Sequence, residues 1–205
     1  MSRRPCRLLL AAALVAVGGT LLAAAPASAG QPTVGVQMVD NHYLPSTAGV
    51  AQGQQVEFSN FGQVAHDARD RSGLDLFDTG FLSSSGEATV GPLPGAGEYR
   101  YYCTFHPEML GRLRVPITAD RGQVPAGSPV TIRWATTRAP TGMVFDVQRR
   151  LPGARRFVDW RVDATAAATR WWPSVHGTWA IRARVRDEGG TDASGWSPVR
   201  TVRVT

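Results

Sequence analysis

The sequence predicts an all-β protein in which two β-sandwich domains follow a short N-terminal signal. Hydrophobic residues alternate with polar residues in short segments, and no stretch shows helical spacing. The 22 glycines and 14 prolines interrupt these segments without any fixed repeat. All six tryptophans lie after residue 133, so the two halves of the chain have differently built cores. With 43% hydrophobic and 19% charged residues, the chain is too apolar to be disordered.

Residues 1–29 have the pattern of a cleaved signal peptide. Three arginines precede an apolar run at residues 8–25, and Ala27-Ser28-Ala29 provides a small-x-small cleavage site. The alternative is a retained membrane anchor, because the run approaches the ~18 residues that a span needs. The glycines and alanines of the run favour cleavage. We therefore expect a protein that is secreted or delivered to the periplasm or cell envelope.

The boundary between the two domains is expected where prolines and glycines cluster, at residues 117–128. We assign the first domain to residues 30–119 and the second to residues 120–205. Expected strands lie near residues 34–38, 56–60, 99–103, 113–115, 130–134, 144–149, 157–162, 179–186 and 199–204, and we expect both sandwiches to be antiparallel. The first domain has five arginines and nine acidic residues (net −4), and the second has fourteen and seven (net +7).

Cysteine usage points to a special role for one residue. Of the two cysteines, Cys6 falls within the signal, so the exported chain keeps only Cys103. A single thiol in an oxidising compartment cannot form an internal disulfide and is open to oxidation. It is protected either by burial as an inert core residue or by binding to a metal.

The residues around Cys103 favour metal binding. Cys103, His106 and Met109 are spaced three residues apart, and Pro107 prevents the segment from continuing as a paired strand. A thiolate, an imidazole and a thioether on one loop suit copper, because Zn²⁺, Ca²⁺ and Mg²⁺ sites do not use methionine. His66 would supply the second imidazole. The four residues together predict a type 1 (blue) copper site with one Cu(I)/Cu(II) ion and a weak axial Met109.

Residues 34–116 resemble the plastocyanin-like cupredoxins, and the C-x-x-H-P-x-M loop at Cys103 is most similar to that of the amicyanins. Two further segments carry the likeness: residues 77–80 (Phe-Asp-Thr-Gly) and residues 97–103 (Gly-Glu-Tyr-Arg-Tyr-Tyr-Cys). The resemblance implies a Greek-key β-sandwich. One departure is Asp67, because the family usually has asparagine directly after the first histidine ligand, where it ties the two ligand loops together. The backbone N–H of Asp67 can still donate to the Cys103 sulfur.

The resemblance also implies a one-electron carrier that exchanges electrons with a transient protein partner. The partner would dock on an apolar patch around His106, for which Phe61, Phe105 and Leu110 are candidates. We do not expect an enzyme, because a trinuclear copper site needs more imidazoles than the four histidines supply. Two alternatives are copper delivery or storage in the cell envelope with the same residues, and an adhesion or scaffold module. His42 and His176 are expected to be ordinary turn or surface residues.

Residues 121–205 resemble a fibronectin type III module through Trp134, residues 179–186 and the Gly-Trp-Ser-Pro segment at 195–198. Trp179 stands where that family prefers a tyrosine. Strand alternation directs the side chains of Arg182, Arg184 and Arg186 outward. Arg150 and Arg203 are expected to lie on the same outer face. This basic face is either a solvated surface, partly compensated by Asp146, or an attachment surface for the anionic cell envelope. A nucleic-acid partner is not expected, and the protein is expected to be a monomer.

Overall fold

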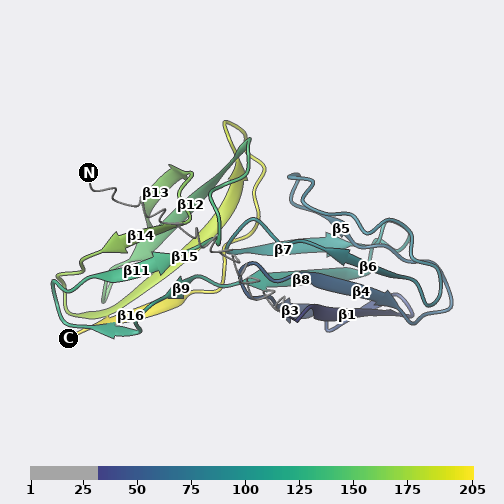
Figure 1. Ribbon diagram of the computed structural model, residues 1–205, viewed down its shortest axis with the longest axis horizontal. Helices are drawn as coiled ribbons and strands as arrows, with labels where there is room; N and C mark the ends of the chain where they lie inside the picture. Colours follow the sequence, from purple (N-terminus) through teal and green to yellow (C-terminus); the bar gives the residue numbers. More distant parts are fainter. Residues whose placement is uncertain (1–31) are drawn as a thin grey trace, which may run out of the picture. The chain divides into compact units, whose positions relative to one another are not determined.

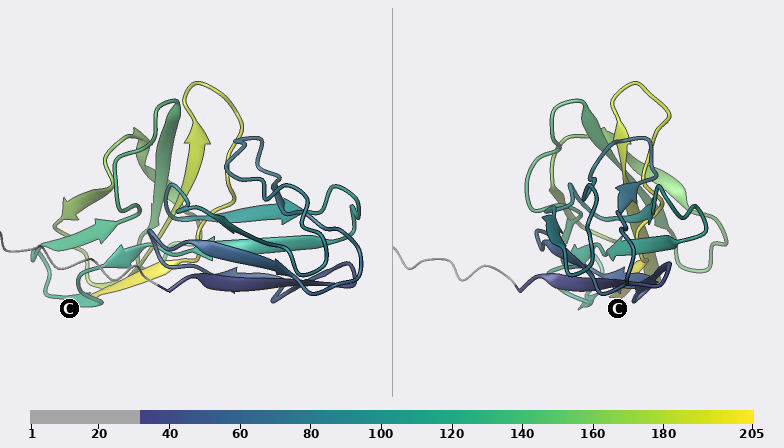
Figure 2. Two further views of the ribbon diagram at one scale, coloured as in Figure 1. Left: turned by 45° about the vertical axis from the view of Figure 1, so that its right-hand side comes forward. Right: turned by 90° about the vertical axis from the view of Figure 1, so that its right-hand side faces the viewer.

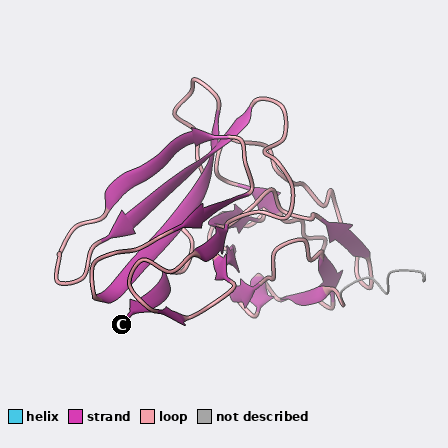
Figure 3. Cartoon of the chain, turned by 60° about the vertical axis from the view of Figure 1, so that its left-hand side comes forward, coloured by secondary structure: helices cyan, strands magenta, loops and turns pink. Residues whose placement is uncertain are grey.

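The computed structural model describes residues 32–205, and all regular secondary structure in this range is β-strand (Figures 1 and 3). The predicted all-β class is therefore confirmed. The predicted signal peptide, with Cys6, lies outside the described residues. Among residues 32–205 there is no helix of the length and apolar character that a membrane span requires.

The first eight strands form two four-stranded sheets (Figure 1). One sheet has the order β2-β1-β4-β6 and the other β3-β8-β7-β5. The strands are β1 (Val34–Val39), β2 (His42–Leu44), β3 (Thr47–Gly49), β4 (Val56–Asn60), β5 (Arg69–Asp70), β6 (Glu87–Val90), β7 (Gly97–Tyr102) and β8 (Leu110–Val115).

The last eight strands form a five-stranded and a three-stranded sheet, which Figure 2 shows from two further directions. Their orders are β10-β16-β15-β12-β13 and β14-β11-β9. The strands are β9 (Thr118–Ala119), β10 (Gln123–Val124), β11 (Val130–Arg133), β12 (Met143–Arg150), β13 (Val158–Ala164), β14 (Ala168–Trp171), β15 (Gly177–Asp187) and β16 (Arg200–Val204). All nine segments expected to be strands are strands, within a few residues at each end.

The sheets are not purely antiparallel, and on this point the expectation was wrong. Three strand pairs run parallel: β1 with β4, β3 with β8, and β10 with β16. For β1 and β4 the reason is that the chain crosses to the other sheet at β3 and then returns in its original direction. A neighbour reached by such a crossover is parallel.

An aromatic cluster fills the first sandwich next to the Cys103 loop. The Tyr101 ring packs edge-on against Tyr43 and Phe58, with centroid distances of 4.6 and 5.3 Å. Phe77 extends the cluster at 6.0 Å from Tyr101. Tyr101 pairs across the sheet with Gly111, where an added Cβ would lie only 2.1 Å from the tyrosine ring. Gly111 therefore leaves the space that the Tyr101 ring occupies. Tyr101 itself lies two residues before Cys103.

Tryptophans dominate the second core, as expected from their distribution. Trp134 is fully buried, and its indole N–H donates to the carbonyl of Ala166 at 2.7 Å. Trp179 is also buried and donates to the carbonyl of Val175 at 3.0 Å. The assignment of residues 121–205 to the fibronectin type III family stays a prediction.

The two pairs of sheets belong to one compact unit, residues 31–205. Glu98 of β7 and Gly195 exchange two backbone hydrogen bonds of 2.9 and 2.8 Å, and Ala96 donates to the carbonyl of Trp134 at 2.6 Å. Strand β9 pairs with β11, so the chain passes from the first pair of sheets to the second before residue 118. The exact domain boundary stays a prediction.

Candidate metal centre

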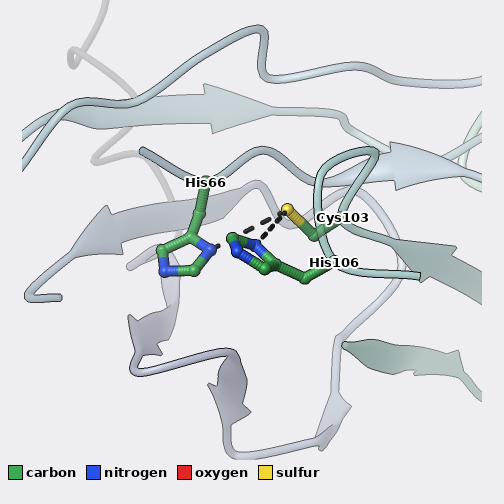
Figure 4. A group of neighbouring side chains, drawn as sticks. All are labelled: His66, Cys103 and His106. Atoms are coloured by element: carbon green, nitrogen blue, oxygen red, sulfur yellow. Dashed lines mark hydrogen bonds between the residues drawn. The ribbon is translucent and has the colours of Figure 1, made fainter. Parts of the chain in front are cut away.

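Three of the predicted ligand side chains converge at one end of the first sandwich (Figure 4). The Sγ atom of Cys103 lies 3.5 Å from Nδ1 of His106 and 3.8 Å from Nδ1 of His66. The two imidazole rings are 4.8 Å apart between centroids. One ligand atom from each residue lies within 4.8 Å of both others, which is a separation that one ion between them can bridge.

The loop between β7 and β8 holds Cys103, His106 and Met109 together. Cys103 directly follows β7, and its N–H donates to the carbonyl of Met109 at 3.1 Å. The N–H of Met109 donates in turn to the carbonyl of His106 at 2.8 Å. Met109 is buried, whereas His106 is partly exposed. The role of the Met109 thioether as axial ligand stays a prediction.

His66 comes from a separate loop that is fixed by backbone hydrogen bonds to Leu82, of 3.1 and 2.8 Å. The side chain is fully buried, and its Nε2 has no hydrogen-bond partner among the described residues. Burial lowers the pKa of His66, and the neighbouring His106 lowers it further. A neutral imidazole with Nδ1 directed at the Cys103 sulfur has a lone pair available for a metal.

Cys103 is buried and has a free thiol, and it is the cysteine that residues 32–205 contain. Burial raises its pKa, and backbone N–H groups of Asp67, Phe105 and His106 counteract this shift by donating toward the sulfur. Burial alone accounts for the protection of the thiol. It does not explain why two imidazole nitrogens face the sulfur, and a bound cation that stabilises the thiolate does.

Asp67 ties the two ligand loops together. Its carboxylate accepts two hydrogen bonds from Thr104, from the backbone N–H at 2.7 Å and from the hydroxyl at 2.6 Å. Its backbone carbonyl accepts a 2.5 Å hydrogen bond from the hydroxyl of Tyr43. Asp67 therefore forms a link between the loops that carry His66 and Cys103. The role of Thr104 was missed in the sequence, because it depends on two loops meeting in space.

Several exposed apolar side chains belong to the segments around this centre. The expected members Phe61, Phe105 and Leu110 are exposed. Sequence reasoning missed Phe81, whose ring packs against Phe105 with a centroid distance of 4.3 Å. The signal was available, because Phe81 directly follows the Phe-Asp-Thr-Gly segment that resembles the cupredoxins.

The two other histidines do not join the cluster. His42 is exposed, and its Nδ1 lies 2.9 Å from the carbonyl oxygen of Asp40. His176 is exposed in the loop between β14 and β15. Neither belongs to a group of three potential metal ligands within the described range.

The basic face of the second domain is more internally paired than we expected. The strand registers place Arg150 and Arg203 on the same side of the sheet as Arg182, as predicted. However, Arg184 and Arg186 both pair with the buried Asp146, at 3.0 and 3.1 Å.

Arg182 is similarly engaged. It donates two hydrogen bonds to Gln148 and stacks between Phe157 and Trp196, at 4.2 and 4.5 Å from the ring centroids. An anionic polymer on this face would compete with partners that the chain already provides.

Asp146 is expected to make stability depend on pH. Burial raises its pKa, but hydrogen bonds from Arg186 and Arg184 outweigh this effect and hold the pKa below its usual value. Because the pKa is lower in the folded than in the unfolded state, the stabilisation exists at neutral pH and is lost as pH falls below about 4. Asp146→Asn should lower the free energy of unfolding at pH 7 by about 2 kcal/mol.

Urea denaturation between about pH 3 and 7 tests this expectation. Asp146→Asn should flatten the acid limb of the stability profile, whereas Glu188→Gln, at an exposed residue of the β15–β16 hairpin, should leave it unchanged. An unchanged acid limb in Asp146→Asn would show that the carboxylate does not contribute.

No protein-family model and no curated protein sequence matches the chain. Solved structures of cupredoxins match about 40% of it. A purple cupredoxin from Nitrosopumilus maritimus is 22% identical, and the match covers 40% of this chain and 98% of that one, with a TM-score of 0.37. The Cu(I) form of an amicyanin variant is 21% identical over 43% of this chain and 86% of that one, with a TM-score of 0.39.

A copper-containing nitrite reductase from Thermus scotoductus is 32% identical over 45% of this chain, with a TM-score of 0.38. The match covers only 24% of the reductase. Since these TM-scores are below 0.5, the assignment of a metal to this chain rests on the donor atoms described above.

Proposed function

We propose that this protein is an exported type 1 copper protein that carries single electrons between redox partners. The observation that supports it is the convergence of a buried thiol and one imidazole nitrogen from each of two histidines, all within 4.8 Å of one another. Cys103, His66 and His106 would hold the metal, and Met109 would be the weak axial ligand. When bound, copper supplies a one-electron Cu(I)/Cu(II) couple.

The chain's own residues suit electron transfer in three ways. Backbone hydrogen bonds fix the loops of His66 and Cys103, so the donors need little rearrangement. His66 and Cys103 are buried and exclude water from the site. His106 is partly exposed and lies on the loop that carries Phe105, just before Leu110 at the start of β8. A small apolar patch suits brief docking, because a redox partner must also leave quickly.

Rapid redox cycling distinguishes an electron carrier from a copper delivery or storage protein. We expect the Cu(II)-loaded protein to be bleached by ascorbate and to regain its colour on oxidation over many cycles, with no copper lost to a chelator in either state. Release of copper to the chelator on each reduction would contradict the electron-carrier proposal and favour delivery. A Cu(II) complex that could not be reduced would also contradict it.

A further inference from the structure

The end of the second sandwich carries a guanidinium group that has no hydrogen-bond or ion-pair partner among residues 32–205. Arg149 is the penultimate residue of β12 and lies opposite Ile181 of β15. Because directly opposed residues point to the same side of a sheet, Arg149 is on the core side. It continues the row of the fully buried Phe145 and Val147. The apolar row on the core side of β12 therefore ends in a positive charge.

Two indole rings flank this charge, and a third packs against both of them. The Cζ atom of Arg149 lies 5.5 Å from the ring centroid of Trp160 and 5.4 Å from that of Trp179. Trp171 packs edge-on against both, at 5.4 and 5.0 Å between centroids. Trp171 and Trp179 are buried, whereas Arg149 and Trp160 are partly exposed. We call these four residues the tryptophan cage, which is open to solvent on the side of Trp160.

No carboxylate neutralises Arg149 within residues 32–205. Its Nε is buried without a hydrogen-bond partner, and the residue takes part in none of the ion pairs of this range. The opposite side of the same sheet differs, since Arg184 and Arg186 share Asp146 there. Burial lowers the pKa of Arg149, and the nearby Arg161 guanidinium lowers it further. An unpaired and partly buried cation is costly, and an anion from outside the chain would offset that cost.

The hairpin next to the cage is also strongly basic. Residues 149–161 contain five arginines and one acidic residue, Asp159, for a net charge of +4. Asp159 accepts a hydrogen bond from Gln148. Arg155 and Arg156 are exposed in the turn between β12 and β13. A ligand at this end of the domain would therefore meet one caged guanidinium and several further charges along the hairpin, which favours a repeating anion over a single one.

We propose that the tryptophan cage and the β12–β13 hairpin bind an acidic oligosaccharide with carboxylate-bearing sugar rings. The planar fork of Arg149 matches a carboxylate, which accepts two parallel hydrogen bonds from it. The indole of Trp160 is partly exposed and would contact the sugar ring that bears the carboxylate, together with Arg161, whose Cζ lies 4.9 Å from the Trp160 ring centroid. Further carboxylates would then lie along Arg155 and Arg156 in the turn of the hairpin. This activity is separate from electron transfer and does not depend on copper.

Oligogalacturonate of defined length is a suitable probe, and its methyl ester is the matched neutral control. We expect the purified protein to bind oligogalacturonate, with a change in tryptophan fluorescence, and to bind the methyl ester at least about tenfold more weakly. Arg149→Gln should weaken binding by a similar factor. Arg182→Gln, on the opposite side of the sheet, should change it less than about twofold.

Thermal unfolding of each variant shows whether it still folds, so that a loss of binding can be told from a loss of structure. If Arg149→Gln does not fold, Arg149→Lys keeps the charge but loses the fork, and we expect it to fold and to bind more weakly. The proposal would be overturned if the ester bound as well as the acid, or if the Arg149 and Arg182 variants lost affinity equally. Equally tight binding of inorganic polyphosphate would also overturn it, because the site would then recognise charge alone.

Discussion

Replacing Cys103 by serine should abolish the intense visible absorption that one equivalent of Cu(II) gives to the wild-type protein. The absorption arises from charge transfer between a thiolate sulfur and Cu(II), and Cys103 supplies the thiolate in this cluster. A serine hydroxyl stays protonated near neutral pH and is a much harder donor, so copper affinity should fall as well. We expect a fall of two orders of magnitude or more, which corresponds to about 3 kcal/mol. Absorption spectra and competition with a copper chelator measure the two effects.

Met109→Leu is the matched control for this experiment. Leucine has nearly the volume of methionine and no sulfur, so the buried loop should keep its packing. The colour should persist, because the thiolate remains, and the reduction potential should rise, because a weak donor to Cu(II) is lost. A colourless wild-type complex with Cu(II) under non-reducing conditions would disprove the blue-site assignment. Equal loss of colour in both variants would show that the loop, and not the thiolate, is responsible.

Alternation predicted the long strands well, because each repeats a buried and an exposed position several times. In β15, Ile181, Ala183 and Val185 are buried and the arginines between them are not, as expected. Short strands such as β5 and β9 have two residues each, which is too few to show a period. The parallel pairs were also invisible, since they depend on where the chain crosses between sheets.

The metal cluster was predictable because its chemistry is concentrated in one short segment. Cys103 and His106 are three residues apart, so a single turn brings them together wherever that turn lies. The hydrogen bonds around them were not predictable in the same way. The contact between Asp67 and Thr104 joins positions 37 residues apart and depends on the relative placement of two loops.

The arginines of the second domain show the limit of reasoning from alternation alone. The pattern correctly placed Arg182 and Arg184 on one side of the sheet. It gave no information on Trp196, which comes from a loop and stacks against both guanidinium groups at 4.5 and 4.8 Å. Contacts with loop residues, which the strand pattern does not show, therefore decide whether the arginines of this face are free to bind a ligand.

Asp67 should lower the reduction potential of bound copper, and Asp67→Asn should raise it. An asparagine can still link to Thr104, because its carbonyl accepts one hydrogen bond and its amide donates another. The substitution therefore removes a negative charge while keeping the loops tied. A carboxylate that is hydrogen-bonded to the residue after Cys103 would favour Cu(II) over Cu(I), since Cu(II) carries one more positive charge. At an effective dielectric constant near 20 this is worth about 1–2 kcal/mol, or on the order of 50–100 mV.

Asp67→Ala distinguishes the effect of the negative charge from the effect of the hydrogen bonds that link the two loops. It removes both hydrogen bonds to Thr104 as well as the charge, so we expect the same rise in potential together with a copper affinity 10–100-fold below that of Asp67→Asn. Voltammetry and chelator competition on the two variants measure these effects. An unchanged potential in Asp67→Asn would mean that solvent screens the carboxylate from the metal. Equal affinities in the two variants would mean that the loops that carry His66 and Cys103 are held without Asp67, through contacts such as the backbone pair between His66 and Leu82.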